Sequence, residues 1–217
     1  MGNRQGSARA QTFREELANT ISHGIALLAS MAAVPVLVAG AADDGELVQV
    51  VGASVFGATM LILYLASTIY HALPAGSVKR LFLLVDHCAI FLLIAGTYTP
   101  FTLGVLRGSW GWALFGMVWG LAIFGILLKS VVGTRYQGLS TCLYLGMGWL
   151  VLVAAQPVLD AVPIPGLLWL LAGGLSYTLG VAFFLVDGRV RFAHTVWHLF
   201  VVAGSVCHFV AVYRYAA

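Results

Sequence analysis

Polar residues divide this chain into seven long apolar stretches, separated by short clusters of charged residues, glycine and proline. Each stretch has roughly the 20 residues that a helix needs to cross a bilayer. The stretches lie at 21–42, 47–70, 82–104, 110–129, 138–158, 165–186 and 194–214. The pattern therefore predicts an all-α membrane protein, a seven-transmembrane helix bundle in which consecutive helices are antiparallel neighbours.

Composition supports a single membrane domain over residues 1–217. Only 9% of residues are charged and 61% are apolar, whereas about 25% of a soluble domain is charged. No convincing small-residue cleavage site follows the first apolar run, so we expect this helix to be retained. The formal charge of +3 is too small and too scattered to indicate nucleic acid binding. Glycines inside the stretches fit close helix packing, among them Gly116, Gly120, Gly173, Gly174 and Gly180.

Lysine and arginine are unevenly divided between the two sets of loops. Cytoplasmic loops retain positive charge, and with the N-terminus inside, nine of the eleven basic residues fall on the inner side. These are Arg4, Arg9, Arg14, Lys79, Arg80, Lys129, Arg135, Arg189 and Arg191, while Arg107 and Arg214 fall outside. We expect a multi-pass protein of the cell inner (plasma) membrane, with residues 1–18 as a cytoplasmic segment and the C-terminus outside.

Five of the six histidines are predicted to lie at one depth, near the inner ends of the helices. They are His23, His71, His87, His194 and His198, whereas His208 lies nearer the outer end. An ionisable side chain inside a membrane is costly unless it is paired, solvated or bound to a metal. Antiparallel helices would bring these distant residues together, so the histidines point to a functional site.

His194 and His198 are four residues apart, which places both rings on one face of a helix. His71 supplies a natural third ligand from another helix at matching depth. A catalytic zinc site uses three protein ligands and keeps one position for water, and imidazoles suit zinc better than calcium or magnesium. The sequence therefore predicts a zinc site at these three histidines.

Asp86 and Ser67 are the candidate catalytic residues beside this site. Asp86 follows an apolar run, and as a base it could orient or deprotonate a metal-bound water. The alternative is an ion pair with Lys79 or Arg80. Ser67 lies one turn before His71, where its hydroxyl could bond that water or a ligand histidine, or simply pack between helices.

His23 shares a helical face with Glu16 and Asn19. We expect these three side chains to support the ligand histidines by contact, although the same pattern fits the wet end of a helix. His87 points about 100° away from Asp86 on an ideal helix, so we expect it to lie at the membrane interface.

Four motifs and His208 together resemble the hemolysin III proteins, the bacterial branch of the progestin and adipoQ receptor family. The motifs are ELANTISHG at 16–24, STIYH at 67–71, DHCAIFLLIAGTYTP at 86–100 and HTVWH at 194–198. The resemblance covers nearly the whole chain. It implies a seven-helix bundle with a cytoplasmic N-terminus and zinc bound by His71, His194 and His198. It also implies that Asp86 and Ser67 contact the metal through its water.

The resemblance leads to three functional hypotheses. Related adiponectin receptors and alkaline ceramidases look like lipid amide hydrolases that hold an acyl chain in the bundle, so the first hypothesis is a ceramidase-like hydrolase with zinc-activated water. The second is a non-catalytic, receptor-like or regulatory protein of membrane lipid homeostasis with a structural zinc. The third, a pore-forming hemolysin, needs a polar stripe through the full membrane depth, and the outer helix halves offer little beyond His208.

Overall fold

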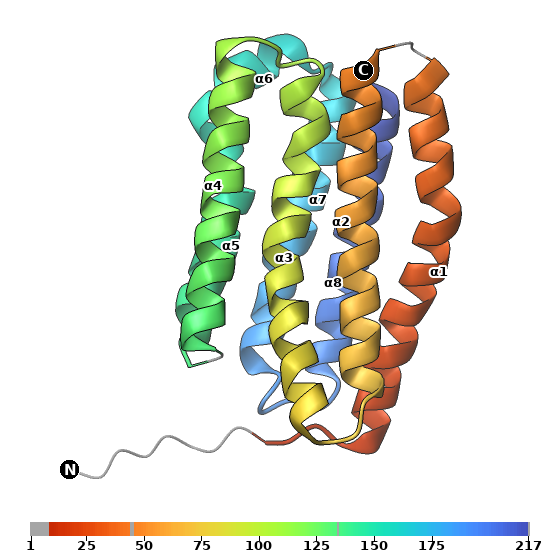
Figure 1. The fold of residues 1–217 in the computed structure, drawn as a ribbon, viewed down its shortest axis with the longest axis vertical. Coiled ribbons are helices and arrows are strands. Elements are labelled where there is room, and N and C mark those ends of the chain that lie inside the picture. Colours follow the sequence, from red (N-terminus) through yellow and green to blue (C-terminus); the bar gives the residue numbers. More distant parts are fainter. Residues whose placement is uncertain (1–8, 44–45, 134, 217) are drawn as a thin grey trace, which may run out of the picture.

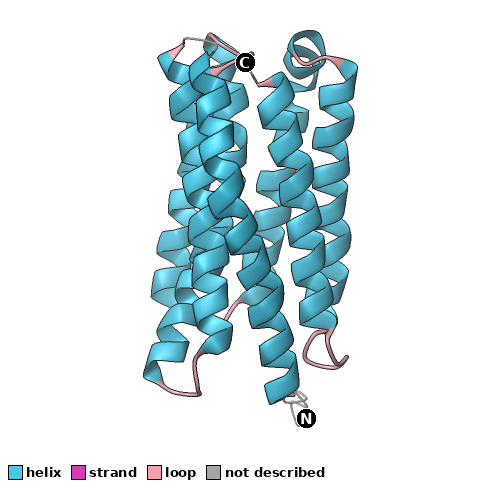
Figure 2. Ribbon diagram, turned by 90° about the vertical axis from the view of Figure 1, so that its right-hand side faces the viewer, coloured by secondary structure: helices cyan, strands magenta, loops and turns pink. Residues whose placement is uncertain are grey.

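The computed structural model describes residues 9–43, 46–133 and 135–216, and over these ranges its regular structure is entirely helical (Figure 1). Seven spans are long and apolar enough to cross a membrane. They are α1 (Phe13–Asp43), α2 (Leu47–Ala72), α3 (Ser77–Leu103), α4 (Ser109–Val132), a compound fifth span, α7 (Ile164–Val186) and α8 (Ala193–Tyr215). Loops are confined to the two ends of the bundle (Figure 2). The predicted seven-helix bundle is confirmed.

The first and third helices begin earlier than the apolar pattern predicts. α1 starts at Phe13 rather than near residue 21, and α3 starts at Ser77 rather than 82. The first turns of α1 carry the buried polar side chains of Glu15 and Asn19. Because these groups find partners inside the protein, the helix continues through residues that hydropathy alone assigns to water.

The fifth span, predicted over 138–158, is present but is not one continuous α-helix. It consists of α5 (Gln137–Gly148), a 3-10 helix (Leu150–Ala154) and α6 (Ala155–Ala161). At the break, the Tyr98 hydroxyl lies 2.9 Å from the carbonyl oxygens of Met147 and Gly148 and accepts a hydrogen bond from Val151 N at 3.0 Å. Backbone groups freed within a membrane need such internal partners.

Glycines on α7 allow close approach to α8. A Cβ atom at Gly180 would lie 2.7 Å from Phe200 Cβ, and one at Gly173 would collide with the His208 ring. Side chains at these positions would force the two helices apart, as expected for small residues at helix contacts.

The close packing predicted for two other glycines is wrong. A Cβ atom at Gly116 or Gly120 would meet nothing within 4 Å, and at Gly174 it would make only ordinary contact with Trp149 at 3.9 Å. The buried face of α4 includes Leu114 and Val118 instead. Both glycines lie away from this face, and composition cannot reveal which side of a helix meets its neighbours.

We call the end where α1, α3, α5 and α8 begin and α2, α4 and α7 end the histidine end; it is the lower end in Figure 1. Eight of the nine predicted inner basic residues lie at or near it, while Arg107 and Arg214 lie at the opposite end. Arg4, the ninth, lies outside the described residues, as do Asp44 and Gly45 of the first predicted loop. That the histidine end faces the cytoplasm stays a prediction from charge.

Candidate metal centre

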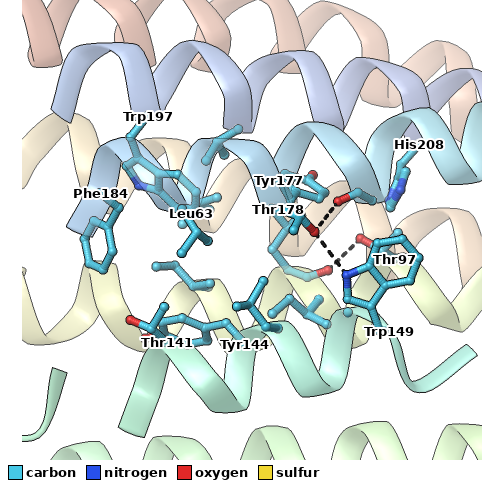
Figure 3. A pocket seen from close by; sticks show the side chains of 18 of the residues that line it. Leu63, Thr97, Thr141, Tyr144, Trp149, Tyr177, Thr178, Phe184, Trp197 and His208 are labelled. Atoms are coloured by element: carbon cyan, nitrogen blue, oxygen red, sulfur yellow. Dashed lines mark hydrogen bonds between the residues drawn. The ribbon is translucent and has the colours of Figure 1, made fainter. Parts of the chain in front are cut away.

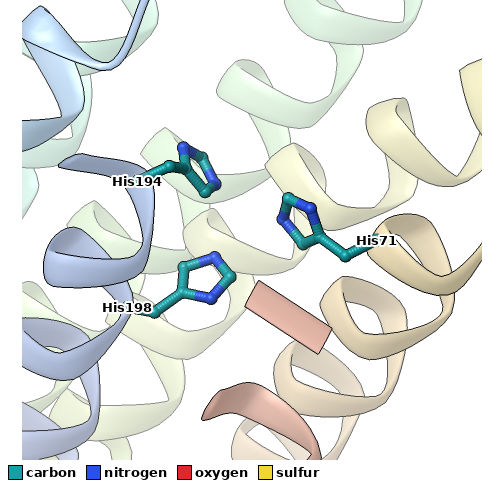
Figure 4. A group of neighbouring side chains, drawn as sticks. All are labelled: His71, His194 and His198. Atoms are coloured by element: carbon teal, nitrogen blue, oxygen red, sulfur yellow. The ribbon is translucent and has the colours of Figure 1, made fainter. Parts of the chain in front are cut away.

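Three histidine side chains meet at the histidine end of the bundle. His71 is the penultimate residue of α2, and His194 and His198 lie in the first two turns of α8 (Figure 4). One ligand atom from each ring lies within 4.8 Å of the other two. His71 and His198 are buried, and His194 is partly buried. These rings form a group that could hold a metal ion.

Each of the three rings is oriented through its Nδ1 atom. The contacts are Glu16 Oε2 with His71 at 2.7 Å, Asp187 Oδ2 with His194 at 2.8 Å and Ser22 Oγ with His198 at 3.0 Å. A carboxylate only accepts hydrogen bonds, so His71 and His194 carry their protons on Nδ1. The single Ser22 hydroxyl proton goes to the Asn19 carbonyl oxygen at 2.9 Å. Its oxygen therefore accepts from His198 Nδ1.

This arrangement leaves a lone pair on Nε2 of all three rings, the atom through which such histidines bind metal while Nδ1–H is held by an outer partner. His71 Nε2 is buried and has no hydrogen-bond partner among the described residues. A buried acceptor of this kind is costly unless something binds it. The donor set, its protonation and the unpaired nitrogen together fit a metal ion.

Asn19 links three helices around the site. Its amide nitrogen lies 3.4 Å from His71 Nδ1, and its Oδ1 accepts a hydrogen bond from the Thr195 hydroxyl at 2.6 Å. The same amide nitrogen donates to Gln11 Oε1 at 2.5 Å. The side chain is completely buried, and through Thr195 it connects α1 to the first turn of α8. Its contact with His71 on α2 is not a hydrogen bond, because the amide nitrogen and the protonated Nδ1 are both donors.

His23 packs against His198, a candidate ligand, rather than joining the three-histidine group. Its ring is stacked on His198 with centroids 3.5 Å apart and planes 9° apart, and its other neighbour is the edge of Tyr64. Neither ring nitrogen has a hydrogen-bond partner within the described part of the chain. The contact restricts rotation of the His198 ring.

Asp86 lies beside the metal centre without a cationic partner. Its carboxyl group is buried on α3, which packs against α2, the helix that carries Ser67 and His71. No ion pair involves Asp86 within the described ranges, because Lys79 instead binds Glu16 Oε1 at 3.0 Å and the Tyr70 carbonyl oxygen at 2.9 Å. The alternative role for Asp86, an interfacial pair with Lys79, is therefore not found.

Ser67 is completely buried, and its hydroxyl has no hydrogen-bond partner among the described residues. A serine that served only for packing would ordinarily bond to a carbonyl oxygen of its own helix, as Ser30 does to Ala26. The free hydroxyl of Ser67 leaves its hydrogen-bonding capacity for another group.

A clamp around Glu15 fixes the start of α8. The Glu15 carboxylate binds Arg9 through two hydrogen bonds of 2.6 and 2.7 Å, and it also accepts from the Thr12 hydroxyl and from Phe192 N. Phe192 adopts a left-handed conformation, with φ at 58°, directly before α8. Such a conformation is costly for a non-glycine residue. The contacts of Glu15 stabilise the left-handed conformation of Phe192, two residues before His194.

Sequence reasoning missed three side chains that position the site: Ser22, Asp187 and Glu15. Ser22 follows Asn19 by three residues, so the polar face of α1 contained a usable signal. In the sequence, Asp187 is one of several polar residues in a short loop. Its contact with His194 crosses an irregular turn, which residue spacing does not describe.

The interfacial position expected for His87 is wrong. The ring is buried, and its centroid lies 6.4 Å from that of Phe184. Because α3 begins at Ser77, His87 lies almost three turns inside the helix rather than at its opening.

Asp187→Asn is expected to weaken metal binding by about 10–100-fold, the usual effect of losing an outer partner of a ligand histidine. Asparagine can present its amide nitrogen to His194, which disfavours the required Nδ1 proton. Competition with a chromogenic chelator would measure the change in affinity. Asp160→Asn, an exposed carboxylate at the opposite end, is the matched control. Equal affinities for the two variants would contradict this role of Asp187.

The comparisons with known proteins agree on one family. The Haemolysin-III related family matches residues 11–209. "Hemolysin-3" of Bacillus cereus is 44% identical, covering 94% of this chain and 93% of its own length. "Hemolysin-3 homolog" of Bacillus subtilis (strain 168) is 41% identical, covering 94% and 95%. "Monocyte to macrophage differentiation factor" of Homo sapiens is 29% identical, covering 94% and 85%.

No solved structure gives a significant match. The family match nevertheless covers most of the chain, and the two bacterial relatives align over almost all of it. The seven apolar helices agree with this assignment. The protein therefore belongs to the haemolysin III family of multi-pass membrane proteins.

Proposed function

We propose that this protein is a zinc-dependent hydrolase of a lipid amide. The observation that carries the proposal is the group of three convergent histidines, together with the buried carboxyl group of Asp86 on α3, which has no cationic partner among the described residues. A carboxylate inside a membrane bundle costs several kcal/mol, so an unpaired one indicates a functional site. A base that acts beside a metal ion is such a function.

His71, His194 and His198 would hold the metal, and three imidazoles favour zinc over calcium or magnesium. When bound, zinc would supply a Lewis acid that lowers the pKa of water to about 7 and polarises a carbonyl group. Asp86 accepts the proton of the water that attacks the amide carbon and delivers it to the departing amine as the C–N bond breaks. The free Ser67 hydroxyl orients the Asp86 carboxylate or the water.

An apolar cavity between α3, α5, α7 and α8 supports a lipid substrate. Thr141, Tyr144, Trp197 and Phe184 line the end of this cavity that lies away from His208 (Figure 3). The Phe184 ring centroid lies 6.1 Å from that of His194. An acyl chain in the cavity would therefore place its first carbons near the metal centre, and each buried CH₂ would contribute about 0.8 kcal/mol.

A second apolar cavity extends the first toward the opposite end of the bundle. The two share a boundary at Tyr98, Trp149 and His208, where the Trp149 indole donates a hydrogen bond to Thr178 (Figure 3). The combined space is long and apolar, which suits an extended acyl chain better than a compact polar substrate.

The test is release of fatty acid from a panel of N-acyl lipids by purified protein in lipid nanodiscs, followed by mass spectrometry. Release is expected from the zinc-loaded protein, to cease after chelation and to return when zinc is restored. A fully zinc-loaded protein that cleaves no lipid amide would overturn the hydrolase proposal. That outcome would favour the second hypothesis, a regulatory membrane protein with a structural zinc.

A further inference from the structure

The two apolar cavities of the bundle meet at Trp149. This residue follows α5 directly, at the break in the fifth span. Each cavity has lining residues of its own, and the two share six: Thr97, Tyr98, Gly148, Trp149, Gly174 and His208. Trp149 has the largest side chain of the six. The boundary between the cavities therefore depends chiefly on where its indole lies.

The indole of Trp149 reaches from the fifth span to α7. Its Nε1 atom donates a hydrogen bond to Thr178 Oγ1 at 3.0 Å (Figure 3). One turn earlier on α7, a Cβ atom at Gly174 would lie 3.9 Å from Cη2 of the same ring. The six-membered ring thus lies next to a residue that has no side chain of its own. The indole stands across the space between the two helices at the boundary of the cavities.

The backbone around Trp149 has several internal partners, whereas its side chain is held by one hydrogen bond. The Tyr98 hydroxyl bonds the backbone on both sides of the break. The Thr178 hydroxyl proton goes to the Gly174 carbonyl oxygen at 2.7 Å, so the Thr178 oxygen is free to accept from the indole. An indole has a single N–H donor, and this bond uses it. Once the bond breaks, the ring can turn while the backbone stays in place.

Apolar space continues beyond the indole. From the end lined by Phe184 and Trp197, an acyl chain would run through the first cavity and meet Trp149 (Figure 3). The second cavity beyond it is lined largely by leucines, among them Leu152, Leu159, Leu167, Leu170 and Leu171. A chain that ends at the indole fits in the first cavity alone, whereas a longer chain enters the second only by displacing the ring.

We propose that Trp149 sets the length of the acyl chain that this protein binds. The indole, held by Thr178, ends the first cavity, so chains that stop there bind with the ring in place. A longer chain has to break the hydrogen bond and leave a buried N–H group without its partner, which costs free energy. The inference rests on the lipid-binding part of the proposed function, and it narrows the substrate class to N-acyl lipids whose chains fit in the first cavity.

The test measures how affinity depends on chain length in a series of N-acylethanolamines, from octanoyl to stearoyl. These probes share one head group and one amide bond, and zinc-free protein in detergent is used so that hydrolysis plays no part. Longer chains also partition more strongly into detergent, so each variant is compared with the wild type at the same chain length. Each CH₂ that a variant buries and the wild type does not should raise the relative affinity about fourfold.

Trp149→Ala joins the two cavities, and it is expected to bind short chains as the wild type does. Above one limiting length, its affinity relative to the wild type should rise with every added CH₂. The unchanged affinity for short chains also shows that the variant is folded. Trp112→Ala is the matched control, because it removes an exposed indole of α4, and it should match the wild type at every length. A ratio for Trp149→Ala that does not depend on chain length would overturn the proposal.

Thr178→Val separates the hydrogen bond from the bulk of the indole. Valine has nearly the shape of threonine but accepts no hydrogen bond, so the Trp149 ring turns away at lower cost. Long chains should then bind about two- to tenfold more tightly than they bind the wild type, the effect of one hydrogen bond, while short chains bind equally. Wild-type affinities at every length would contradict a role for this bond and overturn the proposal.

Two outcomes distinguish this inference from the hydrolase proposal. If the wild type binds no member of the series, the cavity does not hold an acyl chain, and the role of Trp149 falls with the lipid substrate. Length-dependent ratios in a protein that cleaves none of the probes when loaded with zinc would support the role of Trp149 and overturn the hydrolase proposal alone.

Discussion

His198→Ala is expected to abolish tight metal binding and, with it, the stabilisation of the protein by added zinc. The variant removes one of three ligands, so affinity should fall by more than the roughly 100-fold that loss of an outer partner can cost. A ligand present at about 1,000 times its Kd stabilises the folded state by about 4 kcal/mol. Thermal unfolding in detergent, with and without zinc, measures this difference directly.

His208→Ala is the control for this experiment, because it also removes a buried histidine. His208 lies in the half of α8 away from the histidine end, where its Nε2 atom is 3.3 Å from the Leu170 carbonyl oxygen. Both variants are expected to lose some stability without metal, since each leaves a cavity. Only His208→Ala should keep the zinc-dependent rise in Tm. An undiminished rise in His198→Ala would contradict the assignment of His198 as a ligand.

Asp86→Asn is expected to retain the metal and to lose lipid amide hydrolysis by about 100-fold or more, the usual contribution of general acid–base catalysis. Asparagine preserves the size of the side chain and its place beside Ser67 but cannot accept the proton of the attacking water. The measurement is kcat on an N-acyl lipid at full zinc occupancy, with metal content determined on the same sample.

Two results would contradict this role of Asp86. A wild-type kcat at full occupancy would show that Asp86 is not the base. Loss of the metal itself would instead make Asp86 a direct ligand, and a closed set of four protein ligands leaves no position for water. The site would then be structural, as the second hypothesis holds.

The apolar pattern predicted the seven helices because a membrane span has to be both long and apolar. The pattern misplaced the start of α1 because hydropathy treats Glu15 and Asn19 as exposed to water. In the folded chain, Arg9 and Thr195 are their hydrogen-bond partners. The break after Gly148 was equally invisible, since it depends on the Tyr98 hydroxyl of a different helix.

The spacing of His194 and His198 and the depth of His71 were enough to predict that these rings meet, because helical periodicity and antiparallel threading fix both. The partners of the rings depend on tertiary geometry. Glu16 could be found from its helical face, whereas Asp187 reaches His194 across an irregular turn. The burial of Lys129 was missed for a related reason: the sequence shows a basic residue near a helix end but not the neighbours that cover it.

Metal content of the wild-type protein tests the central claim most directly. The protein would be purified in detergent without chelator, and zinc and other transition metals would be measured per chain by elemental analysis. We predict about one zinc ion per chain, held by three histidines. Absence of stoichiometric metal would contradict it and would leave a buried polar cluster whose role is structural or regulatory.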